Sequence, residues 1–168
     1  MTPYITRSAC TLRPASPEDE VPLTALTERR FAWMAERGYE PWPMTPAEVA
    51  SRASMPECPM WVLEMGGRIA GATILLDQPG TAVFTPEERE ETCYVLTSTI
   101  TDPNHAGRHL GDIIATWALE KAAADGRTWV RRVTSEEGLE RYYKAQGFET
   151  LRSRPFKGAT LRAMQRRA

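Results

Sequence analysis

The sequence predicts a mixed α/β fold in which one sheet carries helices on both faces. Segments with apolar residues at helical spacing alternate with segments rich in β-branched residues. Their expected order is a strand, two helices, a run of strands, and then strand, helix, strand, helix and two closing strands, which is typical of a mixed α/β protein. A chain of 168 residues suits one domain, so we expect a single domain over residues 1–168.

The first third of the chain is expected to hold one strand and two helices. Ser16 can cap a helix, and Pro17 fits its first position. Pro22 removes a backbone donor, so a bend or a restart of the helix is expected near it, and Gly38 ends the helix. The expected elements are a strand at residues 9–13, a helix at 23–37, a proline-rich loop at 39–46 and a short helix at 47–54.

The middle of the chain is dominated by predicted strands. Gly66-Gly67 is a strong signal for a hairpin turn between strands at Met60–Met65 and Ile69–Leu76. Prolines and acidic residues predict a linker at residues 79–91. The segment Cys93–Ile100 is rich in β-branched residues and apolar on both faces, so we expect a central strand there.

The last third is expected to alternate helices with strands. Apolar residues recur at helical spacing after Leu110, and Gly126 ends that helix. Ser135 is expected to cap the last helix and Gly147 to end it. The expected elements are helices at residues 110–125 and 136–146 and strands at 128–133, 148–153 and 159–164.

Composition limits the class of protein. The formal net charge of −1 argues against nucleic-acid binding, and no apolar run approaches the length that spans a bilayer. Three widely spaced cysteines predict neither a disulfide framework nor a zinc site. Residues 1–4 do not resemble a signal peptide, so a cytoplasmic protein is expected.

A glycine-containing loop separates the predicted central strand from the helix at residues 110–125. Gly107 and Gly111 leave room for a pyrophosphate to approach the backbone, while Arg108 and His109 add donors. The start of a helix offers unpaired amides and a favourable dipole to an anion. The loop is therefore a candidate phosphate site, and a purely structural turn is the alternative.

Four segments, taken in this order, resemble the GNAT superfamily of N-acetyltransferases. They are Leu12–Asp19, Tyr94–Ile100, Ala106–Gly111 and Leu139–Phe148, which ends in a Tyr-x-x-x-Gly-Phe pattern. The resemblance implies the acyl-CoA N-acyltransferase fold, with a single mixed, mostly antiparallel central sheet. The chain departs from the family pattern at Ala106, at Glu136 and at His109, where a glycine is usual and an unusual backbone dihedral is expected.

The resemblance implies acetyl-CoA as co-substrate and assigns residues to it. The central strand, at Ser98–Ile100, would pair its backbone with the pantetheine arm and would diverge from the strand at 128–133. A backbone amide near Ser98 would then donate a hydrogen bond to the thioester carbonyl. Tyr143 would protonate the leaving thiolate; packing in the core is its alternative role, and Tyr142 is the neighbouring rival. The cofactor-binding residues would be Ser98, Thr99, Ile100, Ala106, Gly107, Arg108, His109, Leu110, Gly111 and Asp112.

The acceptor amine is expected at the segment 33–44, which is rich in aromatic residues and stiffened by prolines. Stiff aromatic walls recognise a ligand at a low entropic cost, although a local hydrophobic cluster is the alternative. The residues assigned to the acceptor are Trp33, Tyr39, Glu40 and Trp42. The candidate bases are Glu40, Glu64, Glu91 or water alone.

The predicted function is acetyl transfer from acetyl-CoA to a primary amine of a small molecule, a metabolite or an amine-bearing antibiotic, by direct attack in a ternary complex. Alternatives are a non-catalytic module that senses acyl-CoA, and acetylation of protein amines. Transfer to charged tRNA is disfavoured by the near-neutral charge. We expect no metal and a monomer or homodimer.

Overall fold

A computed structural model of the protein describes residues 9–168, in which seven strands form one sheet in the order β1-β2-β3-β4-β5-β7-β6. The strands are β1 (Cys10–Pro14), β2 (Met60–Met65), β3 (Arg68–Leu76), β4 (Cys93–Thr101), β5 (Trp129–Thr134), β6 (Glu149–Phe156) and β7 (Ala159–Arg167). Four of the pairings described are antiparallel and one is parallel. The mixed α/β class, the mostly antiparallel sheet and the central place of β4 are thus confirmed.

Five α-helices accompany the sheet in residues 9–168. They are α1 (Glu20–Glu36), α2 (Pro46–Ser51), α3 (Pro86–Glu90), α4 (Leu110–Ala124) and α5 (Glu137–Ala145), and short 3-10 turns lie at Pro17–Asp19, Arg52–Ser54 and Pro103–His105. None of these helices has both the length and the apolar character needed to cross a bilayer. The segment Met1–Tyr4, on which the expectation of no signal peptide rests, lies outside the described residues.

The described chain divides into two compact units. Unit 1 comprises the described residues up to Ile74 together with Ser98–Ile114, and unit 2 comprises Leu75–Thr97 together with Ala115–Ala168. The strand β4 and the helix α4 each begin in one unit and end in the other. The carboxyl end of β4, the loop after it and the segment 33–44 all belong to unit 1.

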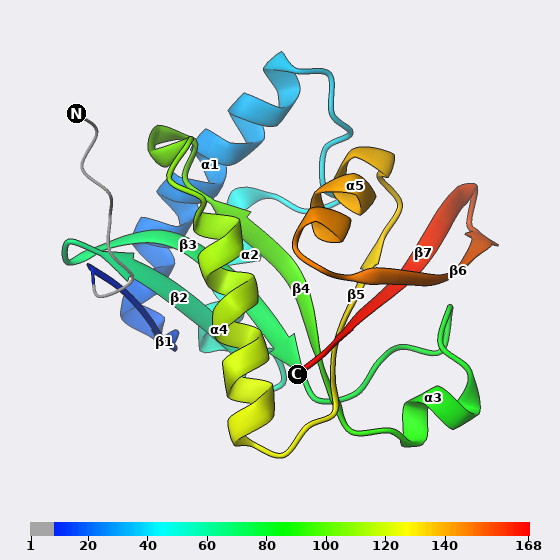
Figure 1. The fold of residues 1–168 in the computed structure, drawn as a ribbon. Helices are drawn as coiled ribbons and strands as arrows, with labels where there is room; N and C mark the ends of the chain where they lie inside the picture. The colour runs from blue at the N-terminus through cyan, green and yellow to red at the C-terminus, as the bar shows by residue number, and fades with distance from the viewer. Residues whose placement is uncertain (1–8) are drawn as a thin grey trace. The chain divides into compact units, whose positions relative to one another are not determined.

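Unit 1 is built on the β2–β3 hairpin. Gly66 and Gly67 have φ angles of 60° and 75°, which glycine adopts without strain, so the predicted turn is confirmed. A side chain at Gly71 on β3 would lie 3.0 Å from the Ile100 carbonyl and 3.5 Å from the Ile114 side chain. A larger residue there would have to displace the Ile100 carbonyl, so β4 and the first turns of α4 pack closely on β3. In Figure 1, α1 passes behind β2 and β3, on the side away from the first turns of α4.

The helix α1 shows how the chain accommodates Pro22. The helix restarts at Glu20 after the 3-10 turn Pro17–Asp19, so Pro22 falls in its first turn. Amides of a first turn have no partner within the helix, so the missing donor of proline costs nothing there. The helix then continues to Glu36, and Gly38 follows with a φ angle of 72°, as the predicted stop requires.

Unit 2 corrects two predictions. The segment 79–91 is not simply a linker, because Thr85 and Glu88 form a capping box that starts the short helix α3. Ser135 does not cap the last helix: α5 begins one residue later than expected, with Glu136 at the capping position. In this unit β4 pairs in parallel with β5 from Cys93↔Trp129 to Val95↔Arg131, and β7 pairs antiparallel with β5 and with β6.

Candidate active site

The carboxyl-terminal half of β4 departs from regular strand geometry at Ser98. Its φ angle of 50° is uncommon for a residue with a side chain and costs free energy, so the surrounding contacts must hold it. The next residue, Thr99, shares a 2.8 Å hydrogen bond with Thr73 of β3, and Ile100 is buried. The strained residue is therefore set in a well-anchored strand.

The end of β4 is fixed by an ion pair between Arg29 of α1 and Asp102. The guanidinium donates from Nη2 to Oδ2 at 2.7 Å and from Nε to Oδ1 at 3.2 Å, and the Asn104 amide donates to Oδ1 at 3.0 Å. Burial opposes the charge on Asp102, but these hydrogen bonds and the charges of Arg29 and His105 outweigh it and lower the pKa of this carboxyl. The carboxylate thus fixes the point where the strand enters the loop.

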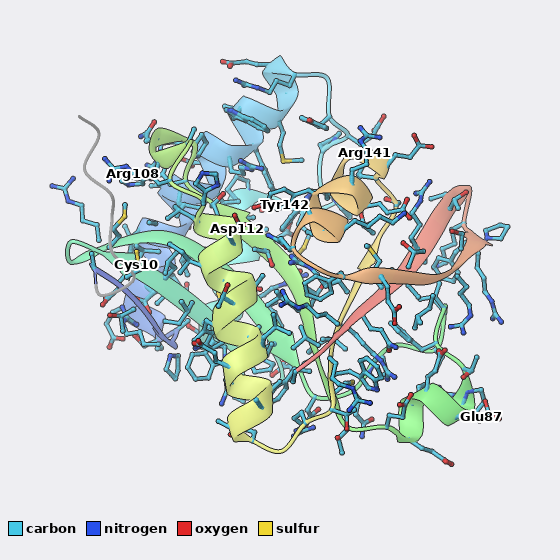
Figure 2. All side chains as sticks on the ribbon, in the orientation of Figure 1. Cys10, Glu87, Arg108, Asp112, Arg141 and Tyr142 are labelled. Carbon is cyan, nitrogen blue, oxygen red and sulfur yellow. The ribbon has the colours of Figure 1, made fainter. Side chains whose placement is uncertain are left out.

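The loop that follows has the backbone geometry that the sequence predicts. Gly107 has a φ angle of 81°, and His109 has the unusual dihedral expected there, with a φ angle of 55°. The side chain of His109 is 78% exposed, and its Nδ1 lies 3.5 Å from Oδ2 of Asp112. Figure 2 labels Arg108 in the loop and Asp112 in the first turn of α4. Arg108 is exposed and its Nη1 lies 4.0 Å from the sulfur of Met65.

The first turn of α4 presents backbone donors. The amides of Asp112 and Ile113 both donate to the His109 carbonyl, at 3.1 and 3.2 Å, and so begin the helical hydrogen bonding. The amides of Leu110 and Gly111 come earlier in the sequence than these two donors and lie at the positive end of the helix dipole. Such amides bind phosphate groups, and Arg108 adds a positive charge close by. The loop can therefore hold an anion of the pyrophosphate type.

Tyr143 lies on α5 in unit 2. The residue is 9% exposed, and its ring packs against Phe148 with 6.4 Å between centroids. The guanidinium carbon of Arg132 on β5 lies 3.7 Å from the centre of the Tyr143 ring. Burial lowers the pKa of the Arg132 guanidinium. A buried phenol beside a guanidinium can donate a proton, and it also packs as a core aromatic.

Tyr142, the neighbouring candidate, has a different environment. It is 41% exposed, and Figure 2 shows it on α5. Its ring centroid lies 5.9 Å from that of Tyr143. The two tyrosines are therefore distinguished by burial, and they provide a matched pair of positions for substitution.

The aromatic residues assigned to the acceptor form two separate clusters. Trp33 stacks on Tyr39 with 5.8 Å between centroids and 9° between planes, and the guanidinium carbons of Arg30 and Arg37 lie 4.3 and 4.0 Å from the centre of the Trp33 ring. Trp42 instead meets Phe31 edge to face at 5.7 Å. Residues two apart on a helix point in nearly opposite directions. The structure thus brings Trp33 together with Tyr39 but places Trp42 elsewhere, and Glu40 between them in sequence is exposed.

Two of the three carboxylates proposed as bases are engaged by guanidinium groups. Glu64 lies 2.9 Å from Arg13 in unit 1. Glu91 in unit 2 accepts from Arg131 at 2.9 Å and from the Trp129 indole at 2.7 Å. Both carboxylates therefore already accept hydrogen bonds from groups of their own unit. Glu40 and water stay as the simpler candidates for the base.

Sequence reasoning missed Arg52, which contacts β4 at the strained residue. Its Nη1 donates to Oγ of Ser98 at 3.1 Å, and its Nη2 lies 2.9 Å from the sulfur of Met44. Arg52 and Ser98 are 46 residues apart in sequence, and no local sequence pattern predicts their contact. The Arg29–Asp102 pair was missed for the same reason.

Comparison with known proteins identifies the fold and the family. The chain resembles the solved structures of a GNAT acetyltransferase from Listeria monocytogenes 4b F2365 (19% identity, TM-score 0.75, 95% of each chain), the Escherichia coli ribosomal-protein-S18-alanine N-acetyltransferase (16%, 0.64, 94% of this chain and 93% of that one) and an agmatine N-acetyltransferase (12%, 0.64, 95% and 100%). No curated protein matches. A model of the acetyltransferase (GNAT) family matches residues 27–148. The chain therefore belongs to the GNAT family of acetyltransferases.

Proposed function

We propose that the whole chain, residues 1–168, is a single N-acetyltransferase domain that transfers the acetyl group of acetyl-CoA to a primary amine of a small molecule by direct attack in a ternary complex. The observation that carries this proposal is that three features follow one another in the chain: the strained Ser98 on β4, the ion pair at Asp102, and the glycine loop at the start of α4. An anchored strand end thus leads directly to a helix start of the kind that binds phosphate.

The residues of unit 1 fit coenzyme A chemically. The amides of the first turn of α4 and the charge of Arg108 suit a pyrophosphate, and the positive φ angles at Gly107 and His109 turn the loop without a bulky group at Gly107. The peptide groups of Ser98–Ile100 would pair with the amides of the pantetheine arm. Acetyl-CoA would supply the activated acetyl group as a thioester.

The chain's own groups would then act on the reacting atoms. A backbone amide near Ser98 would donate to the carbonyl oxygen as negative charge develops on it. Tyr143 would donate its phenolic proton to the leaving sulfur as the bond from that sulfur to the acetyl carbon breaks. Glu40 or water would take the proton from the amine.

The acceptor is proposed to meet the enzyme at the segment 33–44. Its aromatic groups are held by stacking at Trp33 and Tyr39 and by the edge contact at Trp42, so each ring is already ordered. Relatives in the family act on different amines, since one is named for an alanine of a ribosomal protein and another for agmatine. The compact aromatic segment supports a small acceptor.

We further propose that the protein is cytoplasmic and is a monomer or homodimer. The free thiols of Cys10, Cys58 and Cys93 accord with the reducing conditions of the cytoplasm.

Replacement of Gly107 by leucine is expected to weaken coenzyme A binding about tenfold or more. The new side chain would cover the approach to the loop amides, and a lost hydrogen bond to a charged group is worth about 1.5–3 kcal/mol. Calorimetric titration of coenzyme A into the purified variant measures the effect.

Gly158, in the β6–β7 turn, provides a matched control. It has the same φ angle of 81° as Gly107, and a side chain there would likewise meet no atom within 4 Å. Leucine at position 158 therefore introduces the same backbone strain away from the loop. Coenzyme A affinities that fall equally in both variants, or in neither, would remove the loop from the proposed site.

A further inference from the structure

The most informative group outside the family pattern is the guanidinium of Arg52. It begins the 3-10 turn after α2 and is half-buried in unit 1. Within residues 9–168 its partners are the hydroxyl of Ser98 and the thioether of Met44, both neutral. No carboxylate in this range lies within 4.0 Å of it, whereas in the same unit Arg13 binds two carboxylates and Arg29 binds one.

A half-buried cation without a counterion is costly, because it has lost part of its hydration without gaining an ion pair. A thioether is a weak acceptor, and a hydroxyl uses only one of the five N–H groups of the guanidinium. With respect to residues 9–168, Arg52 therefore keeps unused donors and an unneutralised charge beside Ser98. A carboxylate would satisfy both, since it can accept two parallel hydrogen bonds from one guanidinium.

We propose that Arg52 binds a carboxylate on the acceptor, so that the substrate of this enzyme is a small amino acid or a related amine with a carboxylate near the reactive nitrogen. The inference rests on the proposed function for the reaction and adds the class of acceptor. Arg52 touches β4 at Ser98, the residue proposed to lie at the acetyl group. It also contacts Met44, two residues after Trp42, in the segment assigned to the acceptor. The charge thus stands between the acceptor segment and the reacting strand.

The test compares Arg52→Gln and Arg52→Lys with the wild-type enzyme on pairs of acceptors that differ only in the carboxylate. Phenylalanine with phenethylamine and methionine with 3-(methylthio)propylamine are two such pairs. Arg52→Gln is expected to raise KM for the carboxylated member by on the order of 10- to 100-fold, since a hydrogen bond to a charged group is worth about 1.5–3 kcal/mol. The KM of the decarboxylated amine and that of acetyl-CoA should stay nearly constant. Arg52→Lys keeps the charge without the fork and should give an intermediate KM.

For each enzyme, the KM of the carboxylated acceptor is divided by the KM of the decarboxylated one. Comparing this ratio between variant and wild type cancels any difference in the intrinsic reactivity of the two acceptors. Arg89→Gln is the matched control, because Arg89 is exposed at the end of α3 in unit 2. A melting temperature recorded for every variant separates a packing role of Arg52 from recognition, since packing would change both acceptors alike.

Calorimetry with the same acceptors, in the presence of coenzyme A, separates this inference from the proposed function. If the enzyme acetylates both members of each pair equally, and Arg52→Gln changes neither, the inference is wrong while the proposed function stands. If no amine is acetylated but the amino acids bind in a manner that requires Arg52, the carboxylate site stands and the proposed reaction is wrong. If the amino acids neither bind nor react, the inference is wrong.

Discussion

Replacing Tyr143 with phenylalanine is expected to lower kcat by about 10²–10⁴-fold while the KM of acetyl-CoA changes little. A general acid contributes this much when it acts only in the transition state, and its loss then appears in kcat rather than in ground-state binding. The packing would persist, because phenylalanine keeps the ring that contacts Phe148 and the Arg132 guanidinium. Steady-state kinetics measures both constants.

Tyr142→Phe is the matched control for this substitution. The two residues are adjacent on α5, but Tyr142 is much more exposed than Tyr143. The same atom is removed in both variants, so a difference in kcat reports the role of position 143. A Tyr143→Phe enzyme with the turnover of wild type would leave Tyr143 as a core aromatic, and the proton would have to come from another group.

Replacing Arg131 with alanine is expected to lower the free energy of unfolding by about 2–5 kcal/mol, the usual cost of truncating a large buried side chain to alanine. Its side chain is fully buried in unit 2. It donates to the Glu88 carbonyl at 2.5 Å, to Gln165 at 3.2 Å and to Glu91 at 2.9 Å. Alanine would remove the donor to the Gln165 side chain and open a cavity, while the Glu88 carbonyl would keep its hydrogen bond from the Glu91 amide. Urea denaturation monitored by tryptophan fluorescence measures the loss.

Arg154 on the edge strand β6 gives a control, since it is exposed and belongs to the same unit. Alanine there should change the unfolding free energy by less than about 0.5 kcal/mol, as is usual at the surface. If Arg131→Ala costs no more than Arg154→Ala, the buried network does not hold unit 2 together.

Local sequence signals predicted the strands, the turns and most of the helices. The Gly66-Gly67 hairpin and the apolar segment of β4 are set by residues next to each other in the chain, and both are confirmed. The helix α3 was missed although Thr85-Pro86-Glu87-Glu88 carries a capping box, because the prolines and acids around it resemble a linker. Ser135 was misassigned as a cap because the helix begins one residue later.

The candidate site could be predicted only where it depends on local geometry. The backbone at His109 follows from its place in a loop that usually has glycine there, and the expected dihedral is observed. The contacts of Arg29 with Asp102 and of Arg52 with Ser98 join residues 73 and 46 positions apart. Such contacts arise from tertiary packing, and the periodicity of a single segment does not predict which distant residues meet. Trp33 and Trp42 are separated because the α1 residues Trp33 and Phe31, which contact Tyr39 and Trp42 respectively, point in nearly opposite directions from the helix.

The most direct measurement is the mass of the products after incubation of the full chain with acetyl-CoA labelled in the acetyl group, small primary amines and peptides with free amino termini. If the chain acetylates small amines, the label appears in amide linkage on a small amine and free coenzyme A is released in equal amount. The peptides are expected to stay unlabelled. Binding of coenzyme A without transfer to any amine would contradict the proposed enzyme and favour a sensing module. Label on the peptides alone would contradict the small-molecule acceptor.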